Sequence, residues 1–363
     1  MAIQTPVEVV ETAAVDMFPQ RLERTRISPT LLYFARRFGL YLVTLWGAFT
    51  ASFVFFRLIP GDPIGAIVSQ LESQGQYGNQ GGSEAIVAYY RKEFGLDGSI
   101  LTQYVRYLNQ IVVHHNFGPS IVSYPTLSQN LIFRALPWTL GLLGSSVLLG
   151  WVLGVMLGAF VGWARNSRIA GLITNLALLF SHVPAYFIAL FLLFFLSYRL
   201  GTLPPNSAYD ANLSIGWSGA FIASVIKHGI IPVMATAFVG ACNWLITTRT
   251  LVVSILGEDY LTYAGAKGLS SPRILFRYVL RNAWLPQITA LGITIGAVIN
   301  GNVLVERLFR YPGLGNLLVD SILVKDVNTA QGIIVLLIFL VLTLNLIIDL
   351  CLPLFDPRVK YRR

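Results

Sequence analysis

The chain has 363 residues, of which 55% are hydrophobic and only 12% are charged, and its formal net charge is +9. Soluble domains carry about a quarter charged residues, so this composition excludes an ordinary soluble protein. The long apolar runs indicate an all-α polytopic membrane protein, in which the basic excess reports topology and not nucleic-acid binding. Both cysteines, Cys242 and Cys351, fall in apolar runs, which predicts neither a disulfide framework nor a metal site.

Apolar runs predict six transmembrane helices with both termini in the cytoplasm. Residues 1–35 are a mixed-charge tail, and residues 36–363 form a single six-helix membrane domain. The predicted spans cover approximately residues 38–59, 137–163, 169–198, 229–252, 284–309 and 330–352. Lys and Arg are densest in the tail, in the turn near Arg165, in residues 253–283 and at the C-terminus, as the positive-inside rule requires of cytoplasmic segments.

The segment of about residues 60–135 is a long polar stretch, which the topology places outside. Ser83 is a suitable N-cap for a helix that ends near Phe94. His114 and His115 are adjacent, but no further His or Cys lies nearby, so the sequence does not favour a metal site.

The second span carries Gly150, Gly154, Gly158 and Gly162 at four-residue spacing. Small residues at this spacing form one smooth helix face, which permits close approach of a neighbouring helix in lipid. We therefore expect this face to serve packing. Pro184 lies in the middle of the third span and is expected to kink it.

The segment from Gly257 to Pro286 is amphipathic and basic, and it separates two apolar spans. Leu256–Lys267 is expected to form a helix that ends at Gly268 in the left-handed conformation. Ser271 as N-cap and Pro272 at the first helical position are expected to open a second helix. The pattern predicts helix, break and helix on the cytoplasmic side.

This segment resembles the coupling loop of ABC-importer permeases, in the dipeptide, oligopeptide and nickel branch. The resemblance continues at Glu306, at Tyr311–Gly315 and at Asp356–Arg358, and covers roughly residues 36–363. It implies the ABC type I importer permease fold, with a short helix that docks on a cytoplasmic ATPase subunit. The residues that it assigns to this coupling are Glu258, Asp259, Tyr263, Ala264, Ala266, Lys267, Gly268 and Leu269. Tyr263 and Ala264 are expected to face the docking groove.

The resemblance further implies a multi-pass subunit of a bacterial or archaeal inner membrane. A second homologous permease would complete the pathway, and two ATP-binding subunits would hold ATP and Mg. An extracytoplasmic solute-binding protein would deliver dipeptides or oligopeptides, although related machinery carries oligosaccharides or nickel. No Gly-x4-Gly-Lys-Ser/Thr phosphate loop occurs in the chain, so no ATPase activity, catalytic residue or cofactor is predicted for it.

Polar residues within the spans are candidates for the pathway. His182, Asn300 and Asn302 are the predicted lining residues, and interhelical packing is an equal alternative for each. A second class of function, ion-coupled secondary transport, requires an ionisable group near the membrane midplane. Asp349 is the best candidate for that group, although its place near the inner end of the last span favours capping or pairing.

Overall fold

The computed structural model describes residues 29–58, 88–89, 91–93, 95, 97–121, 123–298 and 303–355. Most of these residues are helical, and the one β-type pairing among them is an isolated bridge between Pro119 and Leu127. The all-α fold class is therefore confirmed. Residues 1–28 and 356–363, with most of the predicted tail, lie outside the described part of the chain.

Four described helices are long and apolar enough to cross a membrane: α1 (Pro29–Leu58), α5 (Ser128–Trp163), α8 (Gly219–Ile255) and α14 (Val327–Phe355). A fifth span is formed if α6 (Arg168–Ser181) is counted with α7 (Ala185–Leu192) and the π-helix η1 (Leu193–Arg199). The predicted fifth span corresponds to α11 (Leu280–Val298) and α12 (Val303–Leu308). The count of six and the cytoplasmic termini stay predictions.

Several helices begin earlier than the apolar runs predicted. Helix α5 was predicted from about Pro137 and begins at Ser128, and α8 was predicted from about Gly229 and begins at Gly219. Hydropathy locates the part of a helix that lies in hydrocarbon, whereas backbone hydrogen bonding continues through polar turns beyond it. The kink at Pro184 is confirmed and is large, because α6 and α7 meet there at 101°.

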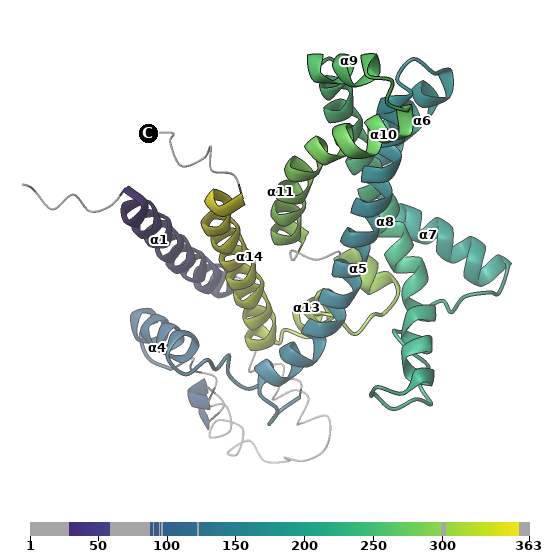
Figure 1. The fold of residues 1–363 in the computed structure, drawn as a ribbon. Coiled ribbons are helices and arrows are strands. Elements are labelled where there is room, and N and C mark those ends of the chain that lie inside the picture. The colour runs from purple at the N-terminus through teal and green to yellow at the C-terminus, as the bar shows by residue number, and fades with distance from the viewer. Residues whose placement is uncertain are drawn as a thin grey trace, which may run out of the picture.

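Helices α5 and α8 form the central pair and run parallel (Figure 1). The glycine face of α5 makes this contact, as the sequence predicts. A Cβ placed on Gly150 would lie 2.9 Å from the carbonyl oxygen of Ala237, and one on Gly158 would lie 2.6 Å from that of Leu245. Gly154 and Gly162 face Ala241 and Val252 in the same order along both helices. The two backbones are thus too close for any side chain at these glycines.

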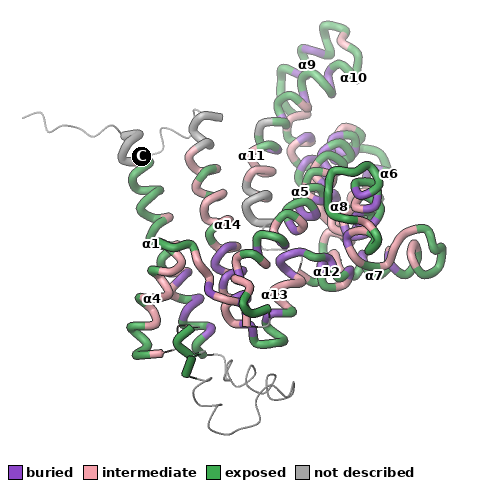
Figure 2. The backbone as a smooth tube through the Cα atoms, turned by 90° about the horizontal axis from the view of Figure 1, so that it is seen from below, coloured by how far each residue is buried: buried purple, intermediate pink, exposed green. Residues whose placement is uncertain are grey.

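A second pair consists of α1 and α14, which lie side by side with α11 and α13 (Leu314–Leu323) between them and α5 (Figure 1). Exposed and half-buried positions dominate α1, whereas buried positions gather on α5 and α8 (Figure 2). The exposed side chains of α1 are large and apolar, which suits lipid or another membrane helix and not water.

The external segment contains a helix that the sequence analysis missed, α4 (Ile100–Val112). Ser99 caps its N-terminus by accepting a hydrogen bond from the backbone N–H of Thr102 at 3.3 Å. Two tyrosines fasten α4 to α1, since the hydroxyl of Tyr104 lies 2.7 Å from that of Thr50 and Tyr107 donates to the carbonyl of Phe49. Of the helix predicted from Ser83, only residues 88–89 and 91–93 are described, and they are helical.

Candidate functional site

The segment between α8 and α11 folds into α9 (Asp259–Ala266), α10 (Ser271–Ile274) and the π-helix η2 (Leu275–Val279), at the opposite end of the molecule from α4 (Figure 1). Gly268 ends α9 with φ of +76°, in the predicted left-handed conformation. Leu269 N–H donates to Ala264 O and Gly268 N–H to Gly265 O, which together form a Schellman motif. The next N-cap is Ser270, one residue before the predicted Ser271.

One face of helix α9 is buried against the rest of the chain, and the other face is exposed. Leu261 and Ala264 are buried, whereas Tyr263 has 70% of its surface exposed. Ala264 therefore faces the chain's own core, contrary to the expectation that it faces a docking groove with Tyr263. Its small side chain permits close packing, and the outward face carries the other residues that the resemblance assigns to coupling. These exposed residues are Glu258, Asp259, Tyr263, Ala266, Lys267 and Gly268, with Leu269 half-buried beside them.

The buried face of α9 belongs to a hydrophobic cluster that joins five elements. Leu261 and Ala264 of α9 pack with Ile274 of α10 and with Leu275 and Val279 of η2. Ala159 of α5 and Val252 of α8 complete the cluster. The buried face of α9 is therefore packed directly against the C-terminal ends of α5 and α8.

Beside α9 lies a polar groove of about 630 Å³. Arg277 and Arg281 line it together with Tyr260, Tyr278 and Asn282, and Asn282 donates from Nδ2 to the Tyr260 hydroxyl at 2.8 Å. The groove presents two guanidinium groups next to the acidic start of α9, where Glu258 and Asp259 are exposed.

Of the predicted pathway residues, only His182 lies in the described part of the chain. His182 caps the end of α6 at the sharp bend, and its Nδ1 lies 2.9 Å from the carbonyl oxygen of Leu178. Its side chain is exposed. Asn300 and Asn302 lie outside the described residues. The position of His182 thus shows a capping contact, and its predicted place in a pathway stays a prediction.

Asp349, the candidate for ion coupling, is paired. Its Oδ2 lies 2.9 Å from Nη1 of Arg37, so the pair joins α14 to α1. Tyr33 also donates to the backbone carbonyl of Asp349 at 3.2 Å. This pairing favours a structural role.

Glu306 is one of the residues that carry the resemblance to ABC-importer permeases. It is fully buried and binds the start of α13. Its Oε1 accepts a hydrogen bond from Thr139 Oγ1 at 2.8 Å, and its Oε2 accepts from the backbone N–H groups of Gly315 at 2.7 Å and Asn316 at 3.3 Å. A carboxylate is favourable at a helix N-terminus, where N–H groups lack internal partners. The sequence showed the motif, but not that its glutamate caps the helix that follows it.

Near the N-terminus of α8 the fold assembles Asp210, Ser224 and His228. Ser224 Oγ donates to Asp210 Oδ2 at 2.7 Å, and Nδ1 of the buried His228 lies 2.8 Å from the Ser224 carbonyl oxygen. In a hydrolase triad the hydroxyl donates to the imidazole, whereas here it donates to the carboxylate. The cluster therefore fastens the loop before α8. Among the residues that the structure describes, no group of three His, Cys, Asp or Glu side chains is placed to hold a metal ion.

Comparison with known proteins supports the resemblance to ABC-importer permeases. Residues 154–361 match the family of binding-protein-dependent transport system inner membrane components. The chain is 32% identical to the oligopeptide transport system permease protein AppB of Bacillus subtilis, over 91% of this chain and 99% of that protein. It is 28% identical to the di/tripeptide transport system permease protein DppB of Pseudomonas aeruginosa, over 92% of this chain and 100% of that protein. It is 30% identical to the glutathione transport system permease protein GsiC of Salmonella typhimurium, over 85% of this chain and 92% of that protein. The chain belongs to the family of binding-protein-dependent transport system inner membrane components, the permease subunits of ABC importers.

Proposed function

We propose that this chain is the transmembrane subunit that forms half of the pathway of an ATP-driven importer for dipeptides or oligopeptides. A second homologous permease subunit completes the pathway, and an extracytoplasmic solute-binding protein delivers the peptide. Two separate ATP-binding subunits hold ATP and Mg and hydrolyse the nucleotide. The names of the relatives AppB, DppB and GsiC, all transport permeases for peptides or glutathione, support this substrate class.

The observation that carries the proposal is the two-faced coupling helix α9. Its exposed face, which includes Tyr263 and Lys267, is free to enter a groove on an ATPase subunit. Its buried face is continuous with the inner ends of α5 and α8 through Leu261 and Ala264. Closure of the ATPase dimer would displace α9 and, with it, the tightly packed α5–α8 pair. A two-state change of this kind is biased by nucleotide because each state binds the ATPase differently.

The test is peptide uptake and ATP hydrolysis by the complete assembly in vesicles, with and without the binding protein. We expect uptake of a dipeptide or tripeptide that requires ATP and the binding protein. Changing the exposed Tyr263 to Arg is expected to uncouple uptake from hydrolysis while leaving the fold intact, because its side chain contacts solvent. The matched control is Tyr198→Arg, which alters a similarly exposed tyrosine (69%) far from α9.

The proposal would fail if no ATP-binding subunit co-purified and the chain alone moved solute down an ion gradient. Uptake of an oligosaccharide or nickel in place of peptide would keep the importer mechanism and refute the substrate class.

A further inference from the structure

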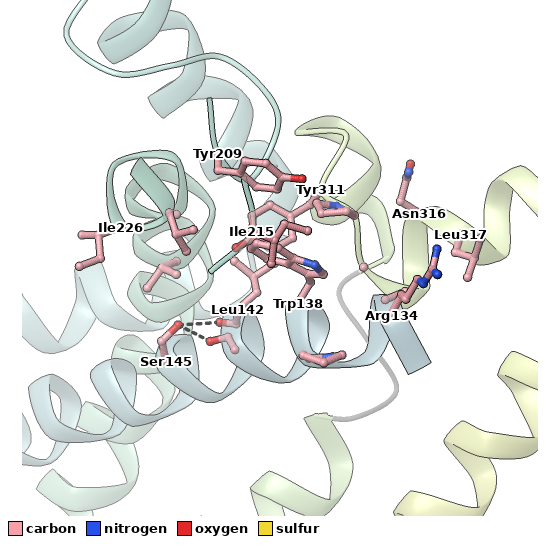
Figure 3. Close-up of a pocket in the computed structure, with 18 of the residues that line it drawn as sticks. Arg134, Trp138, Leu142, Ser145, Tyr209, Ile215, Ile226, Tyr311, Asn316 and Leu317 are labelled. Atoms are coloured by element: carbon pink, nitrogen blue, oxygen red, sulfur yellow. Dashed lines mark hydrogen bonds between the residues drawn. The ribbon is translucent and has the colours of Figure 1, made fainter. Parts of the chain in front are cut away.

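The N-terminal halves of α5 and α8 line a pocket of about 980 Å³ (Figure 3). The glycine contacts hold the two helices together from Gly150 inward. Outward of them, Leu142 on α5 and Val233 on α8 line the pocket and pack in one hydrophobic cluster with Ala208 and Tyr311. The loop around Tyr311 and the loop that contains Tyr209 line two further sides, and the pocket stays partly open. The volume is in the range of sites that hold drug-sized molecules.

One wall of this pocket is a cluster of aromatic rings. Trp138 stacks on Tyr209 with ring centroids 5.5 Å apart and an interplanar angle of 16°. The edges of Tyr311 and Phe221 contact the same indole at 5.9 and 6.3 Å. Such mutual contacts fix the rings in place, so the wall is rigid before any ligand arrives. A rigid aromatic wall suits apolar or aromatic side chains of a solute.

One side of the pocket is polar and positively charged and not aromatic. Arg134 lies there beside Asn316 and Leu317 (Figure 3). A smaller polar pocket that adjoins it shares Asn316 and Asp320 and adds Arg307 and Arg310. Three guanidinium groups thus surround one carboxylate.

Arg307 is engaged, since it pairs with Asp320 and donates to Asn316 Oδ1 at 3.0 Å. Within the described part of the chain, the side chains of Arg134 and Arg310 have no acidic partner. The nearby carboxylate of Glu306 is buried and already accepts three hydrogen bonds. This edge therefore carries uncompensated positive charge and favours an anionic group.

We propose that this pocket is a solute subsite that takes the C-terminal carboxylate of a peptide at Arg134 and Arg310 and an apolar side chain against the Trp138 wall. The inference rests on the proposed function and deepens it, since it names the part of the peptide that the permease itself recognises. An arginine can bind both oxygens of a carboxylate at once, which a neutral amide end cannot match. The subsite thus receives peptides with a free carboxyl end after the binding protein releases them.

The experiment uses the complete detergent-purified assembly without the binding protein, so that selection by that protein plays no part. The probe is a tripeptide that carries benzoylphenylalanine, prepared as the free acid and as the C-terminal amide. We expect the free acid to cross-link to fragments that contain Trp138 or Tyr209, with the amide about tenfold weaker because it loses a charge-assisted hydrogen bond. Arg134→Gln, a change at an exposed side chain, should abolish this preference.

Two glycines of α5 supply a matched pair for blocking the pocket. Gly141 lines it, and Gly144 does not, while a Cβ on either residue would meet nothing within 4 Å. Gly141→Trp should remove the cross-links, and Gly144→Trp should keep them. Equal labelling by acid and amide, equal labelling of both Trp variants, or protection by phospholipid but not by unlabelled peptide would overturn the subsite.

Uptake by the wild-type assembly separates this inference from the proposed function. If vesicles take up no peptide with ATP and the binding protein present, the proposed function fails. If they take up peptide but cross-links avoid the pocket, the subsite alone fails.

Discussion

Thr139 on α5 and Glu306 on α12 are 167 residues apart in sequence, and the threonine hydroxyl donates to the glutamate carboxylate at 2.8 Å. The same hydroxyl oxygen accepts the backbone N–H of Leu314 at 2.7 Å, so both residues bind the first turn of α13. Gly315 is required there, because a Cβ on it would lie 2.8 Å from the Cα of Val303 and 2.9 Å from Glu306 Oε2. This contact ties α5 to α12 and α13.

Glu306→Gln should destabilise the protein by about 2–3 kcal/mol, because an amide NH₂ would face donors that now bind a charged oxygen. Thermal unfolding in detergent measures the loss, and hydrogen exchange at the Gly315 amide should accelerate. Asp320→Asn on α13 is the control, since its pair with Arg307 is exposed and is worth at most about 1 kcal/mol. Equal effects of the two changes would contradict the capping role.

Gly158→Ala should lower stability by about 1–3 kcal/mol through overpacking, since its Cβ would lie 2.6 Å from the Leu245 carbonyl oxygen. Gly144→Ala on the same helix meets nothing within 4 Å, and it should be neutral or stabilising because alanine favours helix by about 1 kcal/mol. The two variants are compared by thermal unfolding in the same detergent. A similar loss in both would show that the α5–α8 contact is looser than the structure has it.

Gly268→Val should weaken coupling, since a β-branched residue at φ of +76° costs at least about 1–2 kcal/mol and would unwind the end of α9. Gly268→Asn should retain more activity, because asparagine adopts the left-handed region more readily. The measurement is peptide uptake per ATP hydrolysed. Gly265→Ala, within α9 and with nothing within 4 Å of its Cβ, is the control for adding a methyl group nearby. Coupling that is equally low in all three variants would argue against a conformational role of Gly268.

Asp349→Asn should leave uptake driven by ATP and insensitive to collapse of the proton gradient, because the carboxylate pairs with Arg37 at 2.9 Å. The exchanged pair Arg37→Asp with Asp349→Arg should recover stability lost in either single change. The recovery is expected to be about 1 kcal/mol or less, since both side chains are more than one-third exposed. Uptake that follows the proton gradient in the wild type and is lost in Asp349→Asn would instead support secondary transport.

Burial, with a smaller contribution from the charge of Glu306, raises the pKa of Tyr311 to about 12. The folded state therefore holds the phenol proton more tightly than the unfolded chain, whose tyrosines titrate near pH 10. The resulting contribution to stability is complete below pH 10 and is lost as the pH rises toward 12, by up to about 3 kcal/mol.

Tyr311→Phe should therefore lose less stability than the wild type between pH 10 and 12, as unfolding midpoints in detergent would show. Tyr263→Phe is the control, because it removes a hydroxyl from a tyrosine that is 70% exposed. A parallel decline in wild type and Tyr311→Phe would refute the assignment.

Local features of the sequence were sufficient to predict many of the helices and turns of this protein. Apolar runs predicted the spanning helices, four-residue glycine spacing predicted the close face of α5, and Gly268 predicted the break after α9. Each depends on neighbours within one or two helical turns, where periodicity and backbone preference act. The motif around Glu306 was visible in the sequence in the same way, but the role of Glu306 in capping α13 was not.

Only the tertiary structure decided which residues meet across long separations in the sequence. It turned Ala264 inward, paired Asp349 with Arg37, placed Glu306 under α13 and opened the pocket between Trp138 and α8. No local pattern encodes these contacts, because helix periodicity shows which side of a helix is apolar and not which helix covers it. That choice depends on how all the helices share one limited interior, where close packing admits few arrangements.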